Sequence, residues 1–187
     1  SPNVLVVHPS LPVKSVKELI ALGKAKPGAL NYGSGASGGP PHLAAELFKA
    51  MAGINMVKVS YKSTGPAVGA VVSGEVQLMF PTSASVATHI KSGRLKALAI
   101  ATAEPSALFP GLPTVAASGL PGYESVTITG IFAPAKTPAP IINRLNQEIV
   151  RLLNRSDVKE KFVAFGSEIV GSSPEQLAVA MKTEIAR

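Results

Sequence analysis

Hydrophobic and polar positions form two kinds of pattern along this chain, one typical of strands and one typical of helices. Short apolar runs rich in β-branched residues, such as Val4–His8 and Leu95–Ala101, are typical of buried strands. Between such runs, apolar residues recur every three or four positions, as from Pro41 to Met51, which is typical of an amphipathic helix. The alternation of the two patterns predicts an α/β fold with a mostly parallel sheet and helices on both faces.

Turn residues and capping signals set the predicted boundaries. Strands are predicted at Val4–His8, Leu30–Gly33, Met56–Tyr61, Val76–Phe80, Leu95–Ala101, Val126–Ala133 and Glu168–Val170. Helices are predicted from the cap Ser15 through Ala25, at Pro41–Met51, Gly65–Ser73, Ser83–Ser92, Pro140–Asn154 and Asp157–Phe165, and from the cap Ser173 to Arg187.

The regular alternation stops between Glu104 and Tyr123, where prolines and glycines cluster. This stretch predicts a loop with one helical turn near Val115–Ser118. Residues 1–125 are therefore predicted to form one α/β unit. Residues 126–187, which begin with a strand leaving that unit, are predicted to pack elsewhere.

Composition narrows the class of protein. Hydrophobic residues make up 46% of the 187 residues and charged residues only 16%, which predicts a folded chain with a sizeable core. The formal net charge of +7 is spread along the sequence, aromatic residues are 5% and tryptophan is absent, so no nucleic-acid partner is expected. The absence of cysteine excludes disulfides and thiolate metal sites. The first residues lack a basic segment and a cleavage site, so they are not expected to be a signal peptide.

One segment between a predicted strand and a predicted helix has the composition of an anion site. It reads Ser34-Gly35-Ala36-Ser37-Gly38-Gly39 and is followed by two prolines. Glycines let the backbone approach a ligand closely, and proline in a first helical turn loses no hydrogen bond. The remaining N–H groups, the two serine hydroxyls and the helix dipole all favour a negative group.

The same segment also matches two enzyme motifs. Gly33–Gly38 fits the dinucleotide-binding pattern G-x-G-x-x-G. The next predicted strand does not end in the acidic residue that would bind the ribose of NAD. An NADP site, with Lys62 binding the 2′-phosphate, therefore remains the alternative to a carboxylate site. Gly35–Gly39 fits the nucleophile pattern G-x-S-x-G, but the acids and histidines that follow suit a triad poorly. His8, His42 and His89 lie far apart, so no metal site is expected.

Two further turns should face the same edge of a parallel sheet. Ser63 and Thr64 follow one predicted strand, and Thr82 and Ser83 follow another. Ligands of open α/β sheets bind at the carboxyl ends of the strands. These hydroxyls are therefore candidate ligand contacts, although ordinary helix capping explains each of them individually. Lys62 is the only formal charge that the sequence places near this predicted pocket.

At these residues the sequence resembles the Bug family, the TctC-like solute receptors of tripartite tricarboxylate transporters. The similarity extends over essentially the whole chain. The strings that carry it are Val13–Leu19, Leu30–Ser34, Pro41–Phe48, Tyr61–Ala67, Gly74–Phe80, Leu112–Val115 and Phe132–Pro138.

The resemblance implies a type II periplasmic binding protein with two α/β lobes that close on a small carboxylate. By that comparison residues 1–125 are lobe two, nearly complete, and residues 126–187 are a hinge strand and the C-terminal part of lobe one. It implies a periplasmic receptor that delivers its ligand to membrane transporter subunits, without enzymatic activity and without a cofactor. The incomplete lobe would leave apolar surface uncovered, which predicts a homodimer through it.

The sequence departs from the family pattern at two places near the expected cleft. Phe80-Pro81 stands where the family commonly has Phe-Asp, and Ile128-Thr129 where it commonly has an aromatic residue. The ligand can therefore differ from the usual dicarboxylates, and an amino acid would lose an acidic partner for its amine.

Overall fold

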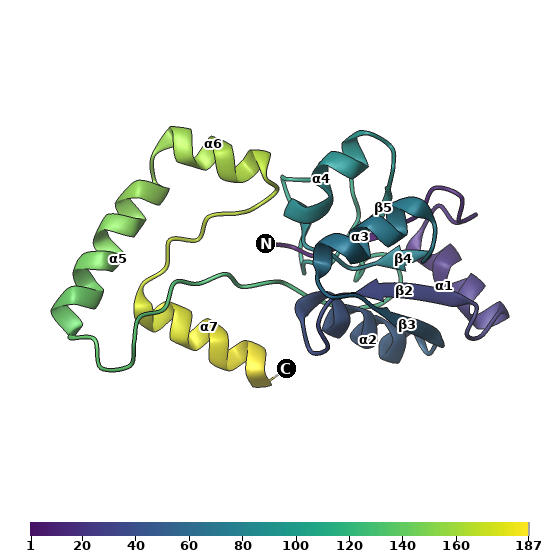
Figure 1. Cartoon of the computed structure of the whole chain (residues 1–187), viewed down its shortest axis with the longest axis horizontal. Helices are drawn as coiled ribbons and strands as arrows, with labels where there is room; N and C mark the ends of the chain where they lie inside the picture. The colour runs from purple at the N-terminus through teal and green to yellow at the C-terminus, as the bar shows by residue number, and fades with distance from the viewer. Residues whose placement is uncertain (187) are drawn as a thin grey trace. The chain divides into compact units, whose positions relative to one another are not determined.

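A computed structural model of the chain describes residues 1–186 (Figure 1). It divides into two compact units, Ser1–Thr127 and the residues from Ile128 onward. The first unit is an α/β unit built on one sheet, and the second contains only helices and irregular segments. The predicted α/β fold class is confirmed.

The sheet of the first unit has the strand order β3-β2-β4-β1-β5. Its strands are β1 (Val4–Val7), β2 (Leu30–Ser34), β3 (Met56–Ser60), β4 (Leu78–Met79) and β5 (Lys96–Ile100). β2 pairs in parallel with β3 and β4, whereas β1 runs antiparallel to both β4 and β5. Two of the four strand pairings are therefore parallel and two are antiparallel, so the sheet is mixed. The predicted parallel arrangement holds for β2, β3 and β4, but the alternation of elements did not indicate that β1 is reversed.

Four helices cover the two faces of this sheet (Figure 1). They are α1 (Val16–Ala25), α2 (Pro40–Ala52), α3 (Thr64–Ser73) and α4 (Ser83–Lys91). α1 and α2 pack on one face and α3 and α4 on the other, because their apolar residues fall in two separate buried clusters divided by the sheet. Helices α2 and α3 end at Gly53 and Gly74, which have the left-handed φ angles of +62° and +79° that favour glycine.

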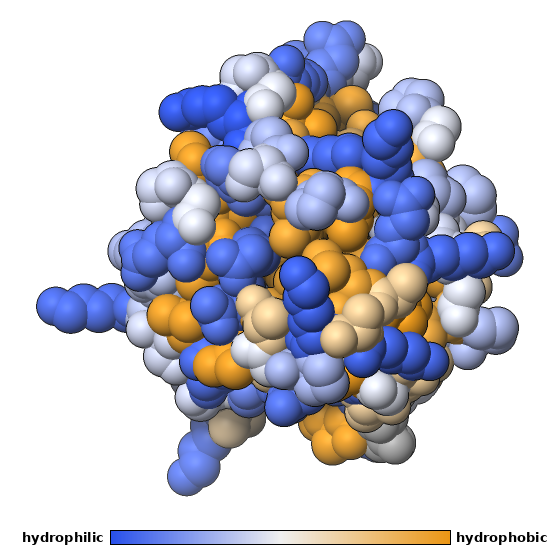
Figure 2. Space-filling model, turned by 90° about the vertical axis from the view of Figure 1, so that its right-hand side faces the viewer, coloured by the Kyte–Doolittle hydropathy of each residue, from blue (hydrophilic) through white to orange (hydrophobic). Residues whose placement is uncertain are grey.

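The α1/α2 layer contains the largest side chains of the core. Phe48 packs against Phe80 and Tyr123 with ring centroids 5.2 and 6.1 Å away. The Tyr123 Oη donates a hydrogen bond of 2.9 Å to the Ala44 carbonyl, so this buried hydroxyl is satisfied. On the side of the first unit seen in Figure 2, hydrophilic side chains surround and partly overlie the hydrophobic atoms near the centre of the view.

The predicted strand Val126–Ala133 is wrong. Only Val126 pairs with another strand segment, through an isolated antiparallel bridge to Pro2, and residues 127–133 are irregular. The predicted strand Glu168–Val170 is also absent from the described residues. A strand needs a neighbour to accept its hydrogen bonds, and β-branched composition alone does not supply one.

The second unit contains α5 (Ala139–Leu153), α6 (Ser156–Ala164) and α7 (Pro174–Ala186). Ser173 caps α7 with Gln176, as predicted: the Gln176 amide donates to Ser173 Oγ and the Ser173 amide to Gln176 Oε1. None of the large apolar side chains described in this unit is buried, and Phe165, Val170 and Ile185 are 69%, 86% and 81% exposed. Within residues 1–186, no helix has the length and apolarity needed to cross a bilayer.

Candidate anion-binding site

The glycine-rich turn after β2 lies directly against the start of α3. A Cβ atom on Gly35 would be 3.1 Å from the carbonyl carbon of Ser63 and from the amide nitrogen of Thr64. Gly35 is buried, and any side chain at this position would require the two backbones to move apart by a few tenths of an ångström, so the close approach favours glycine. The structure therefore brings together the first two of the three turns that the sequence singled out.

The helices that begin at this edge of the sheet lack side-chain caps. α2, α3 and α4 start at the N-cap residues Gly39, Ser63 and Thr82, and none of these makes a side-chain capping hydrogen bond. By contrast α1 follows the reversed strand β1, and its N-cap Ser15 accepts a hydrogen bond from the Glu18 amide. Uncapped N–H groups and the positive end of the helix dipole are favourable for an anion.

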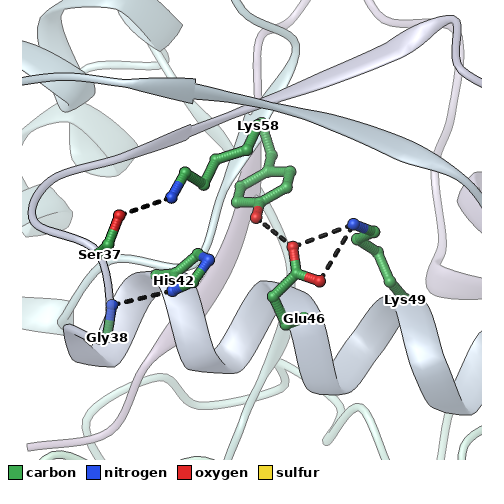
Figure 3. Close-up of polar contacts among 7 residues, drawn as sticks. Ser37, Gly38, His42, Glu46, Lys49 and Lys58 are labelled. Atoms are coloured by element: carbon green, nitrogen blue, oxygen red, sulfur yellow. Dashed lines mark hydrogen bonds and ion pairs between the residues drawn. The ribbon is translucent and has the colours of Figure 1, made fainter.

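Among the described residues, several backbone N–H groups of the turn after β2 have no hydrogen-bond acceptor in the protein. Within residues 1–186, the amides of Gly35, Ala36 and Ser37 donate to no protein acceptor. The next two amides are used: Gly38 donates to Nδ1 of His42 at 3.0 Å, and Gly39 to the Ala36 carbonyl at 3.1 Å. The His42 side chain, from the first turn of α2, thus fixes the end of the turn (Figure 3). The open donors lie at the buried Gly35 and at the exposed Ala36 and Ser37.

Ser34 ends β2 at the base of this turn. The residue is completely buried, and among the described residues its hydroxyl oxygen has no hydrogen-bond partner. A buried hydroxyl without a partner is costly and is expected only where a ligand or ordered water completes it. The Ser34 hydroxyl is therefore a further group, beside the open amides, that a ligand or an ordered water would satisfy.

In the third turn, which precedes α4, polar groups take part in hydrogen bonds within the protein. Thr82 Oγ1 and Ser85 Oγ are 2.6 Å apart, so the Thr82 hydroxyl is engaged within its own helix. Ser83 is completely buried, and its amide donates to the Pro2 carbonyl at 2.9 Å. These contacts bind the start of α4 to the N-terminal segment and leave fewer groups for a ligand than the turn after β2.

The charge nearest the turn comes from Lys58, so the prediction that Lys62 is the only formal charge near the pocket is wrong. The Lys58 Nζ donates a 2.8 Å hydrogen bond to the Ser37 Oγ (Figure 3). The sequence did not indicate Lys58, because its position depends on the parallel register that sets it beside Tyr32.

A polar cluster fastens α2 to β2 just beyond the turn. The buried Tyr32 donates its hydroxyl proton to Glu46 Oε1, and Lys49 Nζ lies 3.0 Å from the same oxygen (Figure 3). Burial opposes ionisation of Glu46, but the hydrogen bonds from Tyr32 and Lys49 and the charges of Lys49 and His42 outweigh it and hold the pKa of Glu46 below its ordinary value. The cluster holds in place α2, the helix whose N-terminus belongs to the candidate site.

Comparison with known proteins places the chain in a family. The family of receptors of tripartite tricarboxylate transporters, TctC, matches residues 1–187. The chain belongs to the TctC family.

Relatives of this TctC chain differ from it at most sequence positions but have a very similar fold. BugT of Bordetella pertussis is 37% identical over 186 residues, which cover all of the chain and 57% of BugT. The structure of Rhodopseudomonas palustris Rpa4515 with adipate is 35% identical, with a TM-score of 0.94 over 100% of the chain and 62% of Rpa4515. MatC of the same organism with bound malate is 30% identical, with a TM-score of 0.88 over 100% of the chain and 64% of MatC. The TctC chain thus spans a little over half the length of the curated relatives it matches.

Proposed function

We propose that this chain forms part of an extracytoplasmic receptor that captures a small carboxylate and delivers it to a tripartite tricarboxylate-type membrane transporter. The carboxylate binds at the turn formed by Ser34, Gly35, Ala36, Ser37, Gly38 and Gly39. The hydroxyls and amides of Ser63 and Thr64 border it, and Thr82 and Ser83 lie at the neighbouring helix start.

The observation that carries this proposal is the convergence of uncapped backbone donors. The turn after β2 offers the amides of Gly35, Ala36 and Ser37 at the N-terminus of α2, and Gly35 touches the uncapped start of α3. A carboxylate accepting two or three backbone N–H bonds is stabilised without an arginine, and each such charge-assisted bond contributes about 1.5–3 kcal/mol.

Similar proteins support the class of ligand. Rpa4515 is described with adipate and MatC with bound malate, both carboxylates. BugD, with a TM-score of 0.86, is described as a periplasmic binding protein. In this proposal the unit that ends at Thr127 supplies most of one lobe, and the residues that follow supply a hinge and part of the other lobe.

The proposal is tested by calorimetry on the full-length protein with adipate, malate, succinate, hexanoate and NADPH. At least one carboxylate should bind with an affinity near micromolar, equivalent to about −8 kcal/mol. NADPH should give no heat of binding. Binding of NADPH with no response to any carboxylate would instead favour a dinucleotide site on the Gly33–Gly38 segment.

The homodimer expected through the second unit remains a prediction. It follows from the exposed apolar side chains of α5, α6 and α7, which include Ile141, Leu145 and Val179. Sedimentation of the 187-residue chain at several concentrations checks it, and a monomer at all of them would contradict it.

A further inference from the structure

The side chain of Lys58 reaches the anion-binding turn from a neighbouring strand. Lys58 lies on β3, paired in register with Tyr32 of β2, and its ammonium group donates to the exposed Ser37 hydroxyl at 2.8 Å. Figure 3 shows the lysine extended along the sheet toward the turn, with the His42 ring below it in the view, on the same side of the Ser37–Gly38 backbone. A hydroxyl that accepts a bond from a cation is polarised to donate its own proton outward.

The charge of Lys58 is not neutralised by an acidic side chain of the described residues. Lys58 takes part in none of the ion pairs found among residues 1–186, which include Lys49–Glu46, Arg144–Glu148 and Arg155–Asp157. Glu46, the acidic side chain drawn near the turn in Figure 3, is already bound by Tyr32 and Lys49. Of the three N–H donors that an ammonium group carries, the bond to Ser37 uses one, so two remain for a bound anion.

We propose that Lys58 is a specificity-determining residue that makes the site favour ligands with two negative charges over ligands with one. The inference rests on the proposed function of the turn. The open amides supply local hydrogen bonds to one carboxylate group, and they do so for either kind of ligand. The unneutralised ammonium adds an attraction that grows with the total charge of the ligand and weakens with added salt.

The test compares a dicarboxylate with the monocarboxylate of equal chain length, adipate and hexanoate, in the full-length protein. In the wild type, the affinity for adipate should fall more steeply with salt than the affinity for hexanoate. The Lys58→Met variant should lose about tenfold in adipate affinity, the size expected for one charge-assisted bond, and clearly less in hexanoate affinity. Its salt dependence for adipate should approach that for hexanoate.

Two further variants separate charge from structure. Lys58→Arg keeps the positive charge and should retain most of the adipate affinity. Lys26→Met removes an exposed lysine beside Gly28, whose amide donates to Asn55 ahead of β3, at the end of the strands opposite the turn, and it should leave the preference between the two ligands unchanged.

Three results would overturn the inference. One is an adipate affinity of Lys58→Met equal to that of the wild type, and another is an equal loss for adipate and hexanoate, which indicates a structural role. In both, the wild type still binds carboxylates and the proposed function stands. If the wild type binds no carboxylate of the panel, the proposed function fails, and the role of Lys58 with it.

Discussion

The backbone of Gly35 and the backbone of Ser63 approach so closely that a single added methyl group would lie 3.1 Å from the Ser63 carbonyl carbon. This contact joins the end of β2 to the start of α3 and sets the width of the proposed carboxylate site. The neighbouring Thr64 amide is equally close, so the obstacle is backbone and not a flexible side chain. Enlarging Gly35 must therefore move one turn relative to the other.

Replacing Gly35 with alanine is expected to weaken carboxylate binding by tenfold or more while the protein remains folded. The methyl group forces the two turns apart by a few tenths of an ångström or more, which disturbs amides that must converge on one ligand group. Calorimetry with the tightest-binding carboxylate of the panel measures the effect, and circular dichroism checks the fold. An unchanged affinity in a folded Gly35→Ala protein would place the ligand elsewhere.

Gly69 offers a matched control for the same chemical change. It lies in α3, has no heavy atom within 4 Å of an added Cβ and has no left-handed backbone angle. Gly69→Ala should leave carboxylate affinity unchanged and stabilise the protein by about 0.5–1 kcal/mol, because alanine loses less conformational entropy in a helix. Urea denaturation measures this gain, and a destabilised variant would show that the α3 surface is more constrained than the structure indicates.

Replacing Tyr32 with phenylalanine should reduce the free energy of unfolding by about 1–2 kcal/mol at pH 7, since Glu46 loses a hydrogen-bond donor. Because the pKa of Glu46 is held low in the folded protein, its stabilising contribution is present above the ordinary pKa of about 4.3 and is lost as the pH falls below it. The difference between wild type and variant should therefore shrink between pH 7 and pH 3.

Denaturant titrations at the two pH values check this dependence, with Tyr61→Phe as the control. Tyr61 donates to Glu75 at 2.8 Å in an exposed pair, so its loss should have a smaller effect. A difference for Tyr32→Phe that grows toward pH 3 would contradict the assignment of the stabilisation to ionised Glu46.

Asn3 connects the two segments that meet at the end of the first unit. Its buried amide donates to Ser125 Oγ at 3.0 Å and accepts from Thr127 Oγ1 at 3.1 Å. Asn3→Ala should lower the free energy of unfolding by about 1–3 kcal/mol, because two hydroxyls lose a partner together. Thr127→Val removes only one of these bonds and should lower the free energy of unfolding by less than Asn3→Ala does. Equal decreases for the two variants would show that the Asn3–Ser125 bond contributes nothing to stability.

Local signals in the sequence predicted local structure well. Turn and capping signals predicted a helix from the cap Ser15 through Ala25, where the structure has α1, and the predicted helix ends at Met51 and Ser73 lie within one residue of the ends of α2 and α3. These signals act within one turn of helix, so a single sequence contains all the information that they need.

Features that depend on distant pairing were missed. The strand expected at Val126–Ala133 is reduced to one bridge, and β1 runs opposite to its neighbours, because both outcomes depend on which strands lie side by side. The same limit applies to the site. The glycine-rich composition indicated the turn, but Lys58 comes within reach of Ser37 only through the register of β3 against β2.

A crystal structure of the full-length protein with the tightest-binding carboxylate of the panel tests the central claim most directly. We expect one carboxylate group at the N-terminus of α2, with its oxygens about 2.7–3.1 Å from at least two of the amide nitrogens of Gly35, Ala36 and Ser37. A ligand bound with full occupancy elsewhere, with these three amides facing only solvent, would contradict the account.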